Sequence, residues 1–109
     1  MIKIAHIKAG KYSPILHCDF CGKRITEAGL AAAVTVSHPI PLEESSEVLH
    51  VHKGACLDAV DERLGRSSGW DELSRHFLHL LHNVNLSPEK LQCYQDADSE
   101  TDLFLVPEA

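Results

Sequence analysis

Two pairs of soft ligands constrain this chain more than any other feature of its sequence. Cys18 and Cys21 form a C-x2-C pair within "HCDFCGKRI", and His52 and Cys56 form an H-x3-C pair within "HVHKGAC". The first pair alone fits a disulfide, a redox motif or half of a metal site. The second pair favours the metal site, because three thiolates and one imidazole make a Cys3His set, a closed structural arrangement for zinc. The sulfur-rich donor set suits Zn2+ better than iron.

A disulfide or a redox role for the first pair fits the chain less well than a metal site. The stretch "MIKIAHIKAGKY" lacks the continuous apolar core of an export signal, so we expect a cytoplasmic protein whose thiols stay reduced. A thioredoxin-like redox role needs a βαβ pattern around the cysteines, and here Cys21 leads into Gly22 instead of a helix. The longest apolar run, "LAAAV", is too short to span a bilayer, so no membrane partner is expected.

The second pair lies where a strand pattern changes to a helix pattern. "EVLHVH" alternates as a strand does, and a helical period follows it. Residues four apart on a helix lie on one face, so His52 at the helix start and Cys56 one turn inside are expected to face a common ion. The helix dipole is expected to favour the Cys56 thiolate. His50 lies on the same side of the strand as His52 and stays an alternative ligand.

This combination resembles a treble-clef zinc finger over residues 15–65. Cys18-Asp-Phe-Cys21 matches the knuckle that provides two ligands in that family, and His52 and Cys56 match the helix start that provides the other two. The resemblance implies a knuckle, a β-hairpin and a helix around one structural Zn2+. The chain departs from the commonest version of the family, because its second pair is H-x3-C instead of C-x2-C and the spacer between the pairs is long.

The predicted fold class is α+β: a small treble-clef zinc-binding unit followed by two amphipathic helices. Strands are expected in the first residues, in "LAAAVTV" and in "EVLHVH", the last two pairing as a long-looped hairpin, and "AGKYSP" is expected to be a turn. Helices are expected from "HKGAC" to a cap at Gly65, over residues 69–84, and from Pro88 with Ser87 as its N-cap. The predicted division is residues 1–109 as a single domain, with 15–65 as the zinc unit, 66–97 as a helical extension and 98–109 as an acidic and apolar tail.

The helix expected over residues 69–84 carries the strongest apolar stripe of the chain. In the simpler interpretation this stripe is core. In the functional interpretation, Trp70 and Phe77 on the stripe and Phe104 in the tail contact a protein partner or a second copy of the chain, as in a homodimer.

Several further histidines and one cysteine lie outside the predicted zinc unit. His76, His79 and His82 recur every three residues, but no cysteine near them completes a ligand set, so we expect them on a solvated or partly buried face. Cys93 is expected to be a small apolar residue of the third helix.

The charge is unevenly distributed along the chain. The formal net charge is −6, with five basic residues against one acidic residue in positions 1–24 and four against eleven in positions 54–109. A broad positive face is typical of proteins that bind nucleic acid, so nucleic acid is the less expected partner. The alternative is a nucleic-acid-binding zinc finger that uses the basic residues around the knuckle. These residues are Lys11, Lys23, Arg24 and Lys53.

The function predicted from the sequence is that of a zinc-stabilised interaction module. The Cys3His site would fix the fold, and the acidic helical half or the tail would bind a protein as an adaptor or regulator does. No enzymatic activity is expected, because a closed four-ligand site keeps no open position for an activated water.

Overall fold

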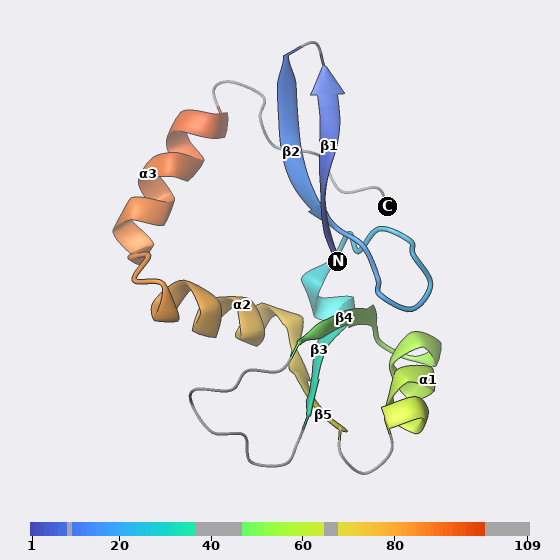
Figure 1. Cartoon of the computed structure of the whole chain (residues 1–109). Helices are drawn as coiled ribbons and strands as arrows, with labels where there is room; N and C mark the ends of the chain where they lie inside the picture. The colour runs from blue at the N-terminus through green and yellow to red at the C-terminus, as the bar shows by residue number, and fades with distance from the viewer. Residues whose placement is uncertain (9, 37–46, 65–67, 100–109) are drawn as a thin grey trace.

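Two small antiparallel sheets and three α-helices make up a mixed α+β structure (Figure 1). The computed structural model describes residues 1–8, 10–36, 47–64 and 68–99. The strands are β1 (Ile2–Lys8), β2 (Lys11–Leu16), β3 (Ala31–Val36), β4 (Leu49–His52) and β5 (Ser68–Glu72). The helices are the 3-10 turn η1 (Ala28–Leu30), α1 (Ala55–Leu64), α2 (Leu73–Asn83) and α3 (Pro88–Ser99). One sheet is the β1–β2 hairpin, and the other has the strand order β4-β3-β5.

The central strand β3 provides a large part of the core. Its residues Ala31, Ala32, Ala33 and Val34 are all buried, which explains why this strand is a continuous apolar run and does not alternate. The other buried members of the core cluster are Cys18, Ile25, Val51, Leu57, Val60 and Leu73. Because Cys18 belongs to this cluster, the candidate metal centre is built directly onto the core.

The predicted hairpin of β3 and β4 is confirmed. The two strands pair antiparallel, with Ala31 opposite His52 and Val34 opposite Leu49. The predicted helix after them is also present as α1, which buries Leu57 and Val60 against the core. The loop over residues 37–46, the predicted cap at Gly65 and the apolar tail with Phe104 lie outside the described residues.

The prediction of a turn at "AGKYSP" was largely wrong, because residues 11–14 belong to β2. Gly10, with φ +74, takes the left-handed conformation at the reversal, and the pairing then runs from Lys8↔Lys11 to Ile2↔Leu16. Pro14 stands opposite Ile4 in this ladder. A proline is tolerated there because each strand of a two-stranded hairpin has an open edge that does not need its N–H.

The helix predicted over residues 69–84 begins later, at Leu73, and Trp70 belongs to a strand. β5 pairs antiparallel with the second edge of β3 and places Trp70 opposite Val34. Gly69 is a poor helix former, and pairing along β3 supplies the backbone hydrogen bonds that the segment needs. The spacing of Trp70 with Leu73 and Phe77 therefore imitates a helical stripe, of which only the part from Leu73 onward is helical.

The start of α3 follows its prediction. The hydroxyl of Ser87 accepts a hydrogen bond from the Lys90 amide at 3.1 Å, and Pro88 is the first helical residue. This is the arrangement of a serine N-cap followed by a proline whose missing N–H costs nothing.

The end of α2 is a Schellman motif that was not predicted from the sequence. The Leu86 amide donates to the Leu81 carbonyl at 2.9 Å, and the Asn85 amide donates to the His82 carbonyl at 3.0 Å. Asn85 has φ +60, and asparagine is one of the few residues that adopts this region readily. Local hydrogen bonds thus define the bend between α2 and α3.

Candidate metal centre

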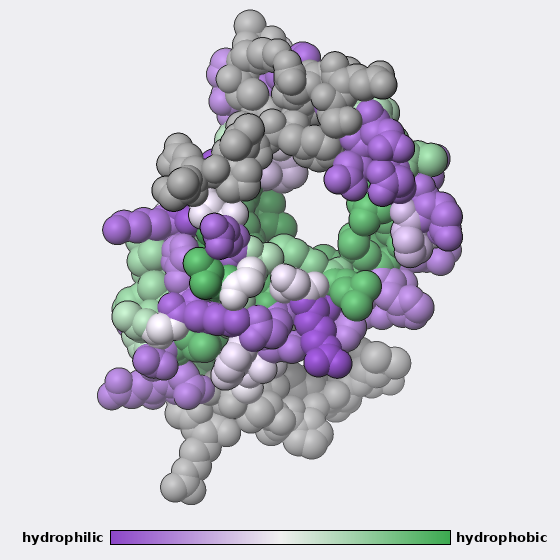
Figure 2. Space-filling view, turned by 180° about the vertical axis from the view of Figure 1, so that it is seen from behind, coloured by the Kyte–Doolittle hydropathy of each residue, from purple (hydrophilic) through white to green (hydrophobic). Residues whose placement is uncertain are grey.

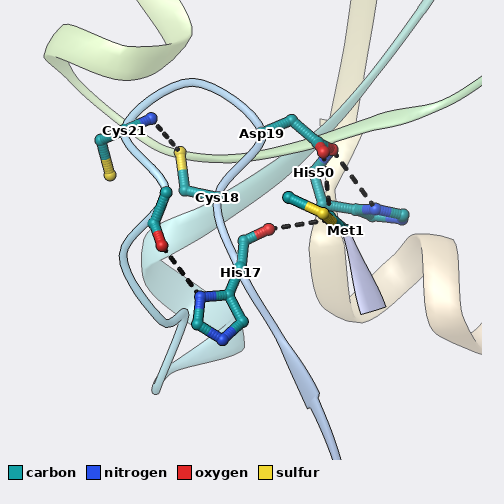
Figure 3. Close-up of polar contacts among 7 residues, drawn as sticks. Met1, His17, Cys18, Asp19, Cys21 and His50 are labelled. Atoms are coloured by element: carbon teal, nitrogen blue, oxygen red, sulfur yellow. Dashed lines mark hydrogen bonds and ion pairs between the residues drawn. The ribbon is translucent and has the colours of Figure 1, made fainter. Parts of the chain in front are cut away.

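The C-x2-C pair lies on a tight loop closed by backbone hydrogen bonds. The Gly22 amide donates to the Cys18 carbonyl at 3.0 Å, and the Cys18 amide donates to the Lys23 carbonyl at 2.8 Å. Gly22 has φ +76, a conformation that glycine adopts without steric cost. The Cys21 amide is directed at Cys18 Sγ at 3.4 Å (Figure 3). The loop therefore aims a backbone donor at the first sulfur, which favours its charged form.

His17 stabilises this loop and is not one of the four clustered donors. Its Nδ1 lies 2.9 Å from the Gly22 carbonyl oxygen (Figure 3), and because a carbonyl only accepts, Nδ1 donates. His17 also pairs with Arg24 as an isolated antiparallel bridge, so the loop closes at its base.

Asp19 joins the loop to the sheet, a role that was not predicted from the sequence. Its amide donates to the His50 carbonyl at 2.8 Å, and its Oδ2 accepts from the His50 amide at 2.8 Å (Figure 3). Its Oδ1 lies 3.2 Å from the Met1 amino group. The reciprocal pair of bonds fixes the loop two residues before His52. No local sequence signal predicts this contact, because it connects segments 31 residues apart.

His52, the last residue of β4, presents one ring nitrogen to the cysteines. Its Nε2 lies 3.3 Å from the Arg24 carbonyl oxygen, and its Nδ1 lies 3.4 Å from Cys21 Sγ. The carbonyl only accepts, so we assign the ring hydrogen to Nε2 and the lone pair to Nδ1. A backbone carbonyl that orients the second nitrogen in this way is typical of histidine ligands.

The alternative ligand, His50, faces a different part of the structure. Its ring packs against His76 and Phe77, with centroid distances of 5.5 and 6.4 Å. Burial lowers the pKa of His50, and the nearby positive charges of the N-terminus and His76 add to this effect. Of the two histidines of β4, only His52 is brought to the cysteines.

Cys56 approaches the cluster through a glycine turn. Gly54 has φ +83 between β4 and α1, and its carbonyl accepts the Asp58 amide at 2.9 Å. His52 therefore lies in the strand and Cys56 in the first turn of α1. We predicted that His52 and Cys56 would converge because they lie four residues apart on one helix. That reason was wrong, because His52 belongs to β4, but the two side chains do converge.

The four donor atoms are close enough together to bind one metal ion. The sulfurs of Cys18, Cys21 and Cys56 and the ring nitrogen of His52 all lie within 4.8 Å of one another. In a tetrahedral zinc site with bonds of about 2.3 Å, sulfur donors lie about 3.8 Å apart. Small side-chain rotations therefore suffice to bring all four donors to a common ion, and the donor set suits a metal such as zinc.

The thiols of the cluster differ in their ease of ionisation. Burial would raise the pKa of Cys18, but backbone N–H groups of Cys21, His52 and Phe20 lower it to about 6. Burial and the neighbouring Cys18 and Cys21 sulfurs raise the pKa of Cys56 to about 11. The expectation that the helix start favours the Cys56 thiolate was wrong for the metal-free site, because burial and the neighbouring sulfurs raise the pKa of Cys56. A bound cation would relieve this crowding.

The basic residues of the nucleic-acid alternative do not all lie at the knuckle. Lys11 begins β2, at the far end of that strand from the knuckle and roughly 20 Å away along an extended chain. Lys53 Nζ donates to the Gly29 carbonyl at 3.0 Å and pairs with the Glu72 carboxylate. Lys23 is exposed on the knuckle loop.

The apolar partner candidates have different surroundings. Trp70 is half exposed on β5, with the Lys53 ammonium 5.9 Å from its ring centroid. Phe77 packs against the core cluster. Cys93 lies on α3, as predicted, and is exposed there.

The predicted histidine row divides between two surroundings. His76 is partly buried beside His50, whereas His79 and His82 are exposed. This agrees with the expected solvated or partly buried face.

Comparison with protein-family models, curated proteins and solved structures finds no match to this chain. In the described part of the chain, no helix has the length and apolar character needed to cross a membrane. The structure thus defines the class of site, a Cys3His cluster of the kind found in zinc fingers, by geometry alone.

Proposed function

We propose that Cys18, Cys21, His52 and Cys56 hold one structural Zn2+ in a treble-clef arrangement. The observation that carries this proposal is the convergence of four soft donors within 4.8 Å on the knuckle loop, the end of β4 and the start of α1. The outer contacts support it, because the Cys21 amide faces Cys18 Sγ and the Arg24 carbonyl orients the His52 ring. When bound, the ion would neutralise the crowded thiolates and connect the knuckle to the sheet.

The zinc unit supports protein–protein interaction in this proposal. No residue of α3 from Pro88 to Asp98 is buried, and large apolar side chains such as Leu78, Leu91 and Tyr94 are exposed along α2 and α3. Exposed apolar surface of this kind is typical of contact sites for other proteins. The division into a zinc unit, a helical extension and a tail stays a prediction. β5, which lies in the predicted extension, pairs with β3 of the predicted zinc unit.

Binding of nucleic acid is the second candidate, with less support. The position of Lys11 away from the knuckle and the ion pair of Lys53 with Glu72 count against a phosphate-binding face. Binding of a DNA duplex or single-stranded RNA that falls steeply with salt and is lost in Lys23→Glu/Arg24→Glu would favour this candidate over the first.

A catalytic role is not part of the proposal. Four protein ligands complete a tetrahedral zinc ion and leave no position for an activated water.

Cobalt substitution tests the coordination directly. Co2+ bound to three thiolates and one imidazole absorbs strongly in the visible range, with sulfur-to-metal charge-transfer bands that scale with thiolate number. We expect such a spectrum at one equivalent of Co2+, its loss in Cys56→Ser, and its retention in Cys93→Ser. A weak spectrum typical of octahedral oxygen ligands would contradict the proposed site.

A further inference from the structure

The three cysteines of the candidate metal centre differ in their access to solvent. Cys18 is buried in the core cluster, Cys56 is half-buried at the start of α1, and Cys21 is exposed on the knuckle loop. The thiolate is the reactive form of cysteine, and its oxidation depends on how exposed it is. A metal ligand is already a thiolate, so a small oxidant in solution would reach a reactive sulfur first at Cys21.

Cys18 is placed to react with Cys21 once that residue has been oxidised. The Cys21 amide lies 3.4 Å from Cys18 Sγ (Figure 3), and the Gly22 amide donates to the Cys18 carbonyl at 3.0 Å. These loop contacts need no metal ion, and the two sulfurs lie within 4.8 Å of each other. Cys56 comes from a separate element, α1, so a disulfide between Cys18 and Cys21 needs movement only within one short loop.

We propose that the C-x2-C knuckle is a redox switch, in which hydrogen peroxide oxidises Cys21, Cys18 closes a disulfide with it, and the metal site is lost. The arrangement that carries this proposal is one exposed and one buried ligand, held side by side by the backbone of the same loop. The inference rests on the proposed zinc site and adds the regulation of that site.

The reaction needs hydrogen peroxide as the oxidant and two protons from solvent. In the first step the Cys21 thiolate attacks one peroxide oxygen, so that an S–O bond forms and the O–O bond breaks. Cys21 becomes a sulfenic acid, and the hydroxide that leaves takes up a proton to become water. In the second step the Cys18 thiolate attacks the Cys21 sulfur, the S–S bond forms, and the S–O bond breaks to release a second hydroxide, which also becomes water. The two cysteines are oxidised and the peroxide is reduced by their two electrons.

The disulfide would not replace the metal as a source of stability. Oxidation removes two of the four donors and leaves His52 and Cys56, which are too few for a closed zinc site. A disulfide stabilises a protein less when the loop that it closes is short, and this loop is only the knuckle itself. The oxidised chain therefore loses the connection between the knuckle and the start of α1 and gains little in return.

The surface proposed for a protein partner depends on the same unit. α2 follows β5 directly, β5 pairs with β3, and Lys53, the neighbour of His52, pairs with Glu72 at the end of β5. Figure 2 shows hydrophobic surface along α2 and α3, beside the opening in the middle of the molecule. Oxidation of the knuckle would thus weaken the support of these helices as well as the metal site.

The experiment exposes the full zinc-loaded chain to hydrogen peroxide and follows released zinc with a chromophoric indicator. Free thiols are then alkylated, and the chain is cut after lysine and arginine for mass spectrometry. Residues 12–23 form one peptide that contains Cys18 and Cys21, whereas Cys56 lies in the peptide 54–63. A disulfide within the knuckle leaves the first peptide unalkylated and lighter by two hydrogens, whereas a bridge to Cys56 joins the two peptides.

Two variants accompany the wild type. Cys21→His removes the exposed thiolate and keeps four donors, because Cys2His2 is also a closed zinc set. Cys93→Ser is the matched control, because Cys93 is an exposed cysteine outside the cluster. Zinc content before oxidation verifies that each variant is loaded.

We expect the wild type and Cys93→Ser to lose their zinc and to form the disulfide within the peptide 12–23. A dithiol reductant with added Zn2+ should restore one zinc per chain, and Cys21→His should keep its zinc in the same peroxide. A wild-type chain that keeps its zinc and its free thiols in excess peroxide would overturn this inference alone, as would a bridge to Cys56 or zinc loss from Cys21→His as fast as from the wild type. A folded chain that holds no zinc before oxidation would instead overturn the proposed zinc site.

Discussion

At the scale of single residues, the candidate metal centre combines one thiol that ionises easily with another that resists ionisation. Backbone amides directed at its sulfur lower the pKa of Cys18 to about 6 despite burial, whereas burial and the neighbouring sulfurs raise the pKa of Cys56 to about 11. Both values describe the metal-free site. A divalent cation among the sulfurs would lower the pKa of Cys56, because it attracts the thiolate that the neighbouring thiolates repel.

Replacement of one ligand should therefore destabilise the fold, whereas replacement of Cys93, the cysteine outside the ligand set, should not. We expect Cys56→Ser and Cys21→Ser to lose bound zinc and to unfold at lower temperature, because an incomplete set binds the ion far more weakly. Cys93→Ser should change little, because Cys93 is exposed on α3. Metal analysis and thermal melts test this, and a Cys56→Ser protein with full zinc content and unchanged melting would show that the ligand assignment is wrong.

The two histidines of β4 should behave differently when each is replaced. His52→Ala removes the nitrogen that faces Cys21 Sγ at 3.4 Å and should abolish stoichiometric zinc binding. His50→Ala removes packing against His76 and Phe77 and should lower stability while leaving one zinc per chain. The zinc-to-protein ratio of the two variants is the measurement. The opposite outcome would make His50 the ligand.

Zinc affinity should fall as the pH falls, with a slope that increases near pH 6. At neutral pH, Cys18 is already largely a thiolate, whereas Cys56 must release a proton when it binds metal, so Cys56 by itself lowers the affinity about tenfold for each unit of decreasing pH. Below about pH 6, Cys18 is protonated as well and adds a second proton to the exchange. Competition with a chromophoric chelator between pH 5 and 8 measures this slope. An affinity independent of pH would contradict thiolate ligation.

At the scale of secondary-structure elements, the local signals were sufficient for some elements and not for others. The ligand spacing, the apolar run of β3, the alternation of β4 and the serine cap of α3 each depend on neighbouring residues, and each predicted its element. β2 and β5 depend on partners elsewhere in the chain. The segment with Trp70 becomes a strand because β3 offers a free edge, which no local pattern reveals.

The same distinction applies to the candidate site. Spacing singled out Cys18, Cys21 and Cys56, and it favoured His52 with His50 as the alternative. The choice of His52 over His50 was left open, because it depends on the Arg24 carbonyl and on Asp19, which reach β4 only in the folded chain.

The bend between α2 and α3 should tolerate glycine at Asn85 and resist β-branched residues. Asn85 has φ +60, and a valine there should cost about 1–2 kcal/mol because its Cβ crowds the backbone in the left-handed region. Asn85→Gly should be close to neutral. Amide hydrogen exchange of α3 reports the difference. Equal protection in both variants would show that the motif does not hold the helix.

At the scale of the whole molecule, the chain is more extended than its length requires. The radius of gyration is 15.8 Å, compared with about 13 Å expected for a compact domain of this length. The excess comes from the hairpin and the α2–α3 arm, which project from the sheet (Figure 1). The small core cannot cover both projections, so the metal would carry much of the stability of the sheet.

The most direct measurement is the metal content of the purified, reduced protein, followed by unfolding in a chelator. We predict one zinc per chain, and loss of the folded signal over residues 15–65 when the ion is removed, because zinc binding of about 10–16 kcal/mol matches or exceeds the stability margin of a small domain. A sample that contains no stoichiometric metal and keeps its circular dichroism spectrum in excess chelator would contradict a zinc-stabilised fold.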